Sequence, residues 1–322
     1  MGDPAGIGGE LTIRAWHALR RTGPTFIALD DPDRLAGIAR DLGLETPIRT
    51  VGAAGERVDD ALCVLPVVLQ GPSRPGRPDP ANAPCVIASI ERAVSLATAG
   101  QVGGVVTNPI SKATLYGAGF AFPGHTEFLG HLTGISHAPV MMLVCPYMRV
   151  VPVTIHVSLR DAISRLTTDA IVAAATVTAD ALSAQFGIAQ PRLAVAGLNP
   201  HAGEGGALGT DEADIIVPAI ARLRQAGIDV SGPYPPDTMF TQAARPTYDA
   251  AICMYHDQAL IPLKTLDMTN GVNVTLGLPI VRTSPDHGTA FDIAGAGRAD
   301  PASLIAAIRL AAELSAHRRG DA

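Results

Sequence analysis

The amino-acid sequence predicts an α/β protein with a largely parallel sheet. Short apolar runs alternate with alanine-rich stretches of helical periodicity along the 322 residues. Several of these runs lack the strict polar alternation of a half-exposed strand, as expected for strands covered on both faces. The 33 glycines and 26 prolines suit many short connections between packed elements. A chain of this length is expected to form roughly two domains.

The expected elements follow in chain order. A first helix is predicted over residues 10–20, where apolar side chains recur at helical spacing. Apolar runs predict strands at residues 25–29, 62–68, 104–107, 148–155, 193–198 and 250–255. Further helices are predicted over residues 84–99, 168–186, 211–226 and 301–317. Asp300 is expected to cap the last helix, with Pro301 at its first position.

Composition and charge exclude several classes of partner. The net charge of −6 argues against a nucleic acid or an anionic membrane surface. Any anionic ligand must therefore be held by a local group of basic residues. No signal-peptide pattern opens the chain, and no apolar run reaches the roughly 18 residues of a membrane span. The four scattered cysteines predict buried, reduced thiols in a cytoplasmic protein: Cys63, Cys85, Cys145 and Cys253.

The chain opens with a glycine-rich stretch, MGDPAGIGGE. Its spacing fits neither G-x-G-x-x-G nor G-x-x-x-x-G-K-[ST], and no strand precedes it. The stretch alone is therefore weak evidence for a phosphate-binding loop. Asp3 and Glu10 are candidates to cap the helix that follows.

Histidines follow three of the expected strands. His156 comes directly after the run at 148–155, His201 shortly after the run at 193–198, and His256 directly after the run at 250–255. Ligands of open α/β sheets bind at the carboxyl ends of strands, and three imidazoles with an open position suit a divalent metal. The separations of 45 and 55 residues match no local zinc motif. From spacing alone, loop histidines bonded to the backbone explain the pattern as well as a metal site does.

Other polar residues surround this pattern. His125 and Thr126 lie on a turn before an expected helix, and Asp237 follows a proline-rich run. Beyond His256, a lysine and an arginine flank an amide, a set that suits phosphate or carboxylate: Lys264, Asn273 and Arg282. Taken singly, each of these residues is better explained as a solvated surface group or a helix cap.

Taken together, six motifs resemble one enzyme family. They are Gly2-Asp-Pro-Ala-Gly-Ile-Gly, Pro123-Gly-His-Thr-Glu, Gly197-Leu-Asn-Pro-His-Ala-Gly-Glu-Gly-Gly, Tyr255-His-Asp-Gln, Gly271-Val-Asn-Val-Thr-Leu-Gly-Leu-Pro, and the run from Arg282 to Gly295. In this order they resemble the 4-hydroxythreonine-4-phosphate dehydrogenases of pyridoxal phosphate biosynthesis. The resemblance extends from residue 2 to about residue 315.

The resemblance implies an activity and a set of site residues. The activity is NAD-dependent oxidation of 4-phosphohydroxy-L-threonine to a 2-amino-3-oxo acid phosphate that decarboxylates, with NADP as the alternative cofactor. The implied metal is divalent, zinc first and magnesium or cobalt as alternatives, on His156, His201 and His256 of a homodimer whose subunits share each metal site. The implied substrate contacts are His125, Thr126, Lys264, Asn273 and Arg282. Asp237 and Lys264 are the candidates for proton transfer.

The resemblance also implies a fold with two α/β/α domains and a cleft, similar to isocitrate and isopropylmalate dehydrogenases. The cofactor-side domain is expected over residues 1–122 and 284–322, and the domain with the metal and dimer contacts over residues 123–283, with each boundary placed to within 15 residues. Residues 286–295 resemble an adenosine-binding loop, with cofactor contacts at His287, Gly288, Thr289 and Asp292. A carboxylate at Asp292 would favour NAD over the 2′-phosphate of NADP. The chain departs from the family in lacking a strand ahead of Gly2 and in carrying Gly9 where proline is usual.

Three alternatives remain from the sequence. A paralogous dehydrogenase on the same scaffold would act on a four-carbon sugar-acid 4-phosphate or an aromatic cis-dihydrodiol. A metal-dependent hydrolase would need no nicotinamide, and the loop at residues 286–295 argues against it. A non-catalytic small-molecule sensor would bind its ligand without turnover.

Overall fold

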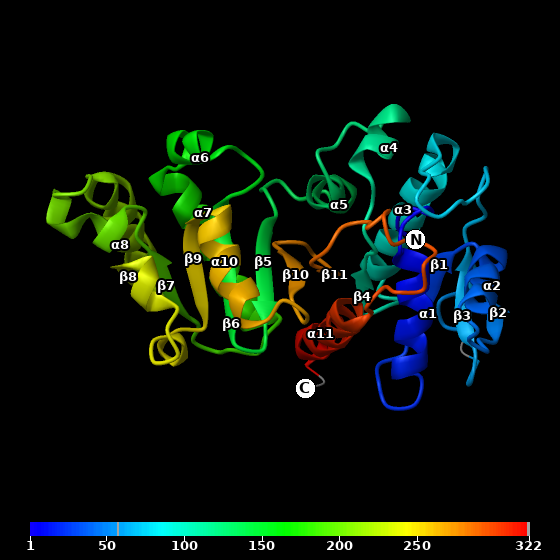
Figure 1. Ribbon diagram of the computed structural model, residues 1–322. Helices are drawn as coiled ribbons and strands as arrows, with labels where there is room; N and C mark the ends of the chain where they lie inside the picture. Colours follow the sequence, from blue (N-terminus) through cyan, green and yellow to red (C-terminus); the bar gives the residue numbers. More distant parts are fainter. Residues whose placement is uncertain (57, 321–322) are drawn as a thin grey trace. The chain divides into compact units, whose positions relative to one another are not determined.

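The computed structural model describes residues 1–56 and 58–320, and it confirms the α/β class (Figure 1). The chain divides into two compact units. Unit 1 comprises residues 1–138 and 278–316, and unit 2 comprises residues 139–277 with the chain end from His317. The expected division had its breaks after residues 122 and 283, so His125, Thr126 and Arg282, assigned to the second domain from sequence, lie in unit 1.

Unit 1 contains two small parallel sheets. One has the strand order β1-β3-β2, and the other pairs β4 with β11 in parallel. Their strands are β1 (Ala28–Asp30), β2 (Ile48–Thr50), β3 (Leu62–Pro66), β4 (Gly104–Val106) and β11 (Val281–Pro285). The helices are α1 (Gly8–Leu19), α2 (Pro32–Asp41), η1 (Pro80–Asn82), α3 (Ala83–Thr98), α4 (Lys112–Gly117), α5 (His125–Thr133) and α11 (Ala302–Arg319).

The start of the chain bonds to β1 and to the segment that follows β4. The amino group of Met1 donates to Leu29 O in β1 at 2.7 Å, and Asp3 N donates to Pro109 O, just past β4, at 2.9 Å. In the part of the chain that the structure describes, no strand joins the two sheets. These two bonds tie residues 1–3 to β1 and to the segment after β4.

Unit 2 is built on a mixed sheet. Its strand order is β10-β5-β6-β9-β7-β8, with β5 antiparallel to both neighbours and the pairs from β6 to β8 parallel. The strands are β5 (Val140–Cys145), β6 (Met148–Thr154), β7 (Arg192–Ala196), β8 (Asp229–Tyr234), β9 (Ala250–Tyr255) and β10 (Val272–Leu276). The helical segments are α6 (Leu159–Arg165), α7 (Thr168–Ala184), η2 (Pro200–Gly206), η3 (Glu212–Ile216), α8 (Val217–Gln225), α9 (Pro236–Met239), η4 (Arg245–Thr247) and α10 (His256–Leu266).

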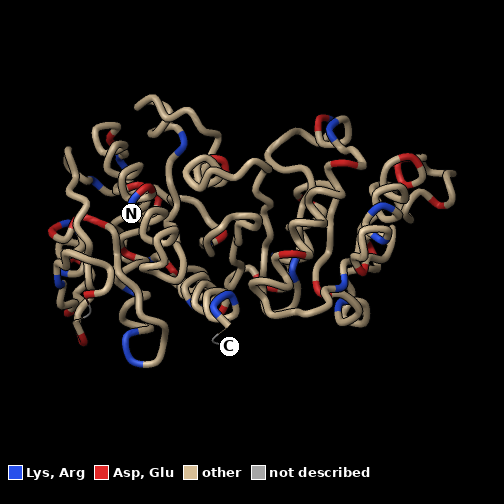
Figure 2. Tube along the Cα trace, turned by 180° about the vertical axis from the view of Figure 1, so that it is seen from behind, with Lys and Arg blue, Asp and Glu red and all other residues tan. Residues whose placement is uncertain are grey.

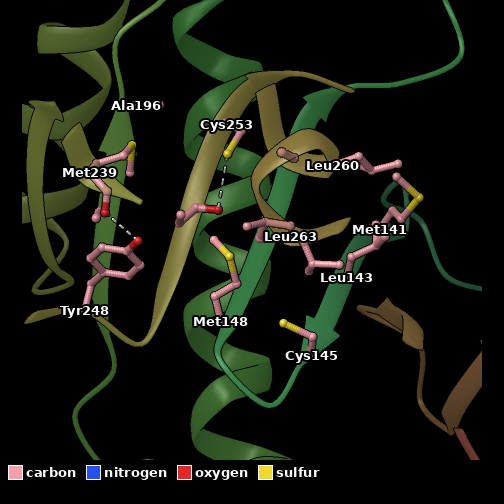
Figure 3. Close-up of a cluster of buried hydrophobic side chains, with 14 residues drawn as sticks. Met141, Leu143, Cys145, Met148, Ala196, Met239, Tyr248, Cys253, Leu260 and Leu263 are labelled. Carbon is pink, nitrogen blue, oxygen red and sulfur yellow. Dashed lines mark hydrogen bonds between the residues drawn. The ribbon is translucent and has the colours of Figure 1, made fainter. Parts of the chain in front are cut away.

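Helices cover both faces of the central strands in unit 2. Figure 1 shows α10 lying across β6 and β9, and α7 packs against the same strands from the other side. In the close-up, Leu260 and Leu263 of α10 point toward Met141 and Leu143 of β5 (Figure 3). Alternate residues of each strand enter this cluster because successive side chains of a strand point to opposite faces. Burial on both faces explains the continuous apolar runs in the sequence.

The predicted elements are largely confirmed, and two details need correction. Ala302 N donates to Asp300 Oδ1 at 2.9 Å, so Asp300 bonds the first residue of the last helix, but this helix begins at Ala302 and not at Pro301 as expected. The expectation for the first helix is wrong: its N-cap is Ile7, and no side chain caps it. Asp3 instead accepts a bond from Ala5 N at 2.9 Å, and Glu10 accepts one from Ala299 N at 3.0 Å. These acids fix loops rather than the helix end.

The surface and the thiols agree with the composition. Basic and acidic residues are interspersed along the trace of both units (Figure 2). All four cysteines are buried and free, as predicted. Burial raises the pKa of the Cys145 and Cys253 thiols, because the interior disfavours a thiolate. Across the described residues, each helix is either too short or too polar to traverse a lipid bilayer.

Candidate active site

Three adjacent parallel strands of unit 2 end at the same edge of the sheet. β9 lies between β6 and β7 and is parallel to both. His156 follows β6, His256 follows β9 as the first residue of α10, and His201 lies in η2 after β7. Because carboxyl ends of parallel strands share one edge, the topology brings the three histidine-bearing segments to the same side of unit 2.

His156 and His256 lie near each other in one chain. Their ring centroids are 5.9 Å apart, with 42° between the ring planes. The centroid of an ion-bound imidazole lies about 3 Å from the ion, so this separation fits two ligands of one metal. His256 Nδ1 bonds Asp257 Oδ1 at 2.7 Å, and in the neutral tautomer that donates this bond Nε2 carries the lone pair that a metal requires. His156 adopts a left-handed φ of 52°, a strained conformation often found at functional positions.

His201 is exposed on the segment η2, after β7. Among residues 1–56 and 58–320, no three histidine, cysteine or acidic side chains form a group that could hold a metal within one chain. The three-histidine metal site therefore stays a prediction. The donor types still fit a divalent ion, because neutral imidazoles are common ligands of zinc and similar metals.

Gln258 connects two of these segments, a role that the sequence did not reveal. Its Oε1 accepts a bond from Met254 N at 2.6 Å, and its Nε2 donates to Gly197 O at 2.7 Å. The buried amide thus ties the end of β9 to the residue that follows β7. The only signal in the sequence was its place in the motif Tyr255-His-Asp-Gln.

The remaining predicted residues of unit 2 lie on three different elements. Asp237 is exposed on α9, which contacts η2 and hence the segment that carries His201. Lys264 is half-buried on α10, about two helical turns beyond His256. Asn273 lies in β10, and its Oδ1 is buried without a hydrogen-bond partner. A buried acceptor of this kind is expected to meet a donor from a ligand or a water.

Unit 1 gathers positive charge around His125, the first residue of α5. Arg282 is buried in β11, where its Nη2 donates to Thr107 Oγ1 at 2.6 Å, and burial lowers its pKa to about 10. Burial lowers the pKa of His125 well below its usual range, and the positive charges of Arg282 and Lys112 lower it further. The imidazole is therefore neutral near pH 7, and its Nε2 is buried without a partner. Thr126 follows it, half-buried, in the same turn of α5.

Lys112 was not singled out from the sequence. A Cβ placed on Gly124 would lie 3.6 Å from Lys112 Nζ, so the ammonium group sits beside the turn that leads into α5. A guanidinium and an ammonium near a neutral imidazole suit an anion with several oxygens, such as a phosphate group. No local sequence pattern connects Lys112 with Arg282, which a distant strand supplies.

The predicted cofactor loop packs on the glycine-rich start of the chain. Ile7 N donates to Thr289 O at 3.1 Å, and a Cβ on Gly6 would lie 2.9 Å from the same oxygen. His287 Nδ1 bonds Gly288 O at 3.0 Å, whereas its Nε2 is buried without a partner. Asp292 is exposed and can reach a ligand. The first glycines of the chain therefore support this loop by permitting close backbone approach.

Comparison with known proteins shows the family to which the chain belongs. The family model for pyridoxal phosphate biosynthetic protein PdxA matches residues 24–311. A 4-hydroxythreonine-4-phosphate dehydrogenase from Caulobacter vibrioides is 56% identical over 322 residues, covering 98% of this chain and 96% of the relative. The crystal structure of the enzyme of that name from Klebsiella pneumoniae has a TM-score of 0.88 at 39% identity, covering 98% of both chains. A terephthalate 1,2-cis-dihydrodiol dehydrogenase from Burkholderia xenovorans has a TM-score of 0.65 at 31% identity, covering 96% of this chain and 95% of that one.

The fold and the relatives together place the chain among the α/β dehydrogenases, a class of oxidoreductases. The chain belongs to the PdxA family of pyridoxal phosphate biosynthetic proteins. It is accordingly a dehydrogenase of pyridoxal phosphate biosynthesis, a class that uses a nicotinamide cofactor.

Proposed function

We propose that the protein oxidises 4-phosphohydroxy-L-threonine with NAD to a 2-amino-3-oxo acid phosphate, which then loses CO2. The observation that carries this proposal is the 56% identity, over 98% of the chain, to a relative that bears the name of this activity. The charge distribution supports it, because the protein is acidic overall yet concentrates positive charge around His125. The lower identity of 31% to a cis-dihydrodiol dehydrogenase makes that activity the second candidate.

We propose His156, His201 and His256 as ligands of a divalent metal, zinc first among the candidates. The 5.9 Å separation of two of the rings and the carboxylate on His256 Nδ1 support the assignment. A divalent cation bound there supplies positive charge that polarises the substrate's hydroxyl group and stabilises the negative charge that develops as CO2 leaves. Asp257 fixes the orientation and tautomer of His256, so that Nε2 stays available.

The substrate's anionic groups require hydrogen-bond donors or positive charges, and each unit contains side chains that supply them. In unit 1, Arg282 supplies a buried guanidinium, His125 a neutral imidazole and Thr126 a hydroxyl group, a set suited to phosphate. In unit 2, Lys264 supplies an ammonium group and Asn273 an amide whose Oδ1 accepts no bond within the protein. A neutral His125 can donate one N–H bond without adding to the charge that Arg282 and Lys112 already provide.

We propose the segment at residues 286–295 as the contact for the adenosine part of NAD, which serves as the hydride acceptor. The exposed Asp292 carboxylate supports this, because it can accept bonds from ribose hydroxyls and repel a 2′-phosphate. The buried Nε2 of His287 and the exposed backbone at Gly288 offer further contacts, next to Thr289. The residues thus fit NAD better than NADP.

Two protons move in this reaction. The hydroxyl proton is lost on oxidation, and a proton returns to carbon after CO2 leaves, so a side chain must exchange protons at the substrate. We propose Asp237 and Lys264 for this role, because a carboxylate can accept the first proton and an ammonium group can donate the second. Asp237 lies on α9, against the segment that carries His201.

We further propose a cytoplasmic homodimer whose subunits share each metal site. The four buried, free cysteines support a reducing compartment. Within the part of the chain that the structure describes, His201 belongs to no group of three potential ligands, in line with a site completed by a second subunit.

A substrate panel tests the reaction. Purified enzyme with NAD is offered 4-phosphohydroxy-L-threonine, a four-carbon sugar-acid 4-phosphate and an aromatic cis-dihydrodiol, while the absorbance of reduced nicotinamide is followed. The highest kcat/KM is expected for the amino-acid phosphate, with release of CO2. A higher kcat/KM for either of the others would assign the chain to that paralogous activity, and no turnover of any would favour a sensor.

Metal removal tests the ligand set. Chelation should abolish turnover, and added zinc should restore it. His201→Ala should lose bound metal and activity together, because two imidazoles bind zinc far more weakly than three. A fully active, metal-free His201→Ala protein would refute this assignment.

A further inference from the structure

The loop that presents His201 has an unusual backbone. Five consecutive residues have left-handed φ angles: 52° at His201, 52° at Ala202, 79° at Gly203, 45° at Glu204 and 66° at Gly205. For a residue with a Cβ, this conformation costs roughly 1–2 kcal/mol, and it normally occurs at single positions. Three of the five carry a Cβ, so the surrounding structure must hold the loop in place.

The buried carboxylate of Glu212 provides this hold. Its Oε1 accepts bonds from the backbone N–H groups of Leu198 at 2.8 Å and Asn199 at 2.7 Å. Its Oε2 accepts a bond from Asn199 Nδ2 at 3.0 Å, and the same amide donates to Asp211 Oδ2 at 2.9 Å. Only 6% of Glu212 is exposed. One carboxylate therefore anchors both residues that lead into the left-handed segment.

Three glycines near this carboxylate lack the Cβ that would crowd it or its partner Asn199. A Cβ on Gly203 would lie 2.5 Å from Glu212 Oε2, and one on Gly197 would lie 3.3 Å from Oε1. A Cβ on Gly209 would lie 2.6 Å from Asn199 Nδ2, the group that Glu212 binds. Glu212 itself begins η3, a π-helical turn, and such turns occur frequently at functional sites. The loop thus closes tightly on a single anionic group.

We propose that Glu212 is a positioning residue that holds the loop after β7 in the conformation in which His201 binds the metal. The inference rests on the proposed function, because it takes His201 as a metal ligand. Glu212 acts through the backbone at residues 198 and 199 and through the Asn199 amide, and makes no contact with the metal itself. Glu212 thus orients His201 by fixing the main chain, whereas Asp257 orients His256 by bonding its ring.

The role requires a carboxylate. Both Glu212 oxygens only accept hydrogen bonds, and the three groups that face them are all donors. In Glu212→Gln one oxygen is replaced by an NH2 group, which must then face either the two backbone N–H groups or Asn199 Nδ2. A donor facing a donor leaves buried groups unsatisfied, so the loop is expected to leave its native conformation.

Zinc binding by the folded apoprotein tests the proposal. The dissociation constant is measured by competition with a chromophoric chelator for the wild type, Glu212→Gln, Asn199→Ala and His201→Ala. Asp214→Asn is the matched control, because Asp214 is an exposed carboxylate on the same π-helical turn. Urea unfolding confirms that each variant is folded under the conditions of the titration. Hydrogen exchange of the peptide spanning residues 193–206 reports the loop directly, and kcat and KM are measured at saturating zinc.

Glu212→Gln should weaken zinc binding by about 10–100-fold, the usual effect of losing a partner that orients a metal ligand. It should also speed exchange in the loop peptide and raise KM at saturating zinc, whereas Asp214→Asn should match the wild type. Asn199→Ala removes the bonds to Glu212 Oε2 and Asp211 Oδ2 but keeps both backbone bonds to Glu212 Oε1, so it should give a smaller loss in the same direction. It tests the proposal even if Glu212→Gln does not fold.

Two outcomes would overturn the proposal, and they are distinguishable. The first is that Glu212→Gln folds and binds zinc as tightly as the wild type while His201→Ala loses most of its zinc affinity. This result would show that Glu212 serves stability alone. If Glu212→Gln does not fold, Asn199→Ala takes its place in the comparison. Wild-type affinity in His201→Ala would instead refute the metal assignment, and the positioning role would fall with it.

Discussion

Two histidines of the molecule have opposite surroundings. His256 bonds a carboxylate through Nδ1, whereas His125 lies in a cationic environment with its Nε2 buried and unpaired. A histidine beside an acid is oriented for ligation, and a histidine beside an arginine is kept neutral. The same side chain can therefore serve a metal in one unit and an anionic group in the other.

Neutral His125 should make stability depend on pH. Its pKa in the folded protein is lowered, so the unfolded chain binds more protons once the pH falls below the unperturbed value of about 6.5. The free energy of unfolding should therefore fall as the pH is lowered from 7.5 to 5.5, and His125→Asn should reduce this loss. Urea midpoints at the two pH values measure it. His131→Asn, an exposed histidine of the same helix, should retain the wild-type difference; equal pH dependence in all three proteins would contradict the prediction.

Asp292 should set the cofactor preference. The wild type is expected to prefer NAD, and Asp292→Asn should lower kcat/KM for NAD by about 10-fold or more, because bonds between a hydroxyl and a charged group contribute about 1.5–3 kcal/mol. Its activity with NADP should be unchanged or higher. Asp300→Asn is the control, since asparagine caps a helix as well as aspartate does. Equal kcat/KM for NAD and NADP in the wild type would count against the assignment.

Among the secondary-structure elements, several strands buried on both faces were predicted, such as β7 and β9, whereas the equally buried β10 and β11 were not. The sequence of β9 is a continuous apolar run, which predicts a strand because nearly all of its residues are buried. β5 was missed because its two methionines favour a helix as readily as a strand. The left-handed turn after β7 was also missed, because only two of its five residues are glycine and the conformation depends on Glu212, a later residue. Local patterns cannot report a backbone held by a distant side chain.

Gly76 should be needed for the cofactor loop. It has a φ of 72°, and a Cβ there would lie 2.8 Å from Phe291 O, one residue before Asp292. Gly76→Ala should therefore displace this loop and raise KM for NAD several-fold, while zinc affinity stays unchanged. Gly43→Ala is the matched control, because Gly43 has a similar φ of 65° but nothing within 4 Å of its Cβ position. An equal effect of both substitutions on KM would attribute it to backbone strain and not to the loop.

For the whole molecule, the sequence predicted the shared sheet edge of the three histidine segments, but it did not predict which side chains meet in unit 1. Resemblance supplied the residue types, and strand order explains why the three histidine segments share an edge. The hydrogen bond between Arg282 and Thr107 joins positions 175 residues apart, and the effect of Arg282 on His125 likewise depends on tertiary packing. Sequence spacing carries no information on such pairs. It also carries none on which ligands come from a second subunit.

If the two subunits share each metal site, two inactive variants should restore each other's activity when they form a mixed dimer. Mixing inactive His201→Ala and His256→Ala proteins and allowing subunit exchange should restore about a quarter of wild-type activity. Half of the dimers are then mixed, and each holds one intact site if the two ligands come from opposite subunits. If both ligands belong to one chain, every site lacks a histidine and activity stays absent. Mass spectrometry of differently tagged subunits verifies the exchange, and each variant alone is the control.

Because every cysteine is buried, the native thiols of the folded protein should not react with a labelling reagent. Cys63, Cys85, Cys145 and Cys253 are each at most 6% exposed, and reactive thiolate is disfavoured at Cys145 and Cys253. A maleimide dye should therefore leave the folded wild type unlabelled. One cysteine introduced on the surface of each unit would then carry a fluorophore pair without removal of any native thiol. Energy transfer between the two dyes would report, during turnover, whether the units move toward each other when NAD binds.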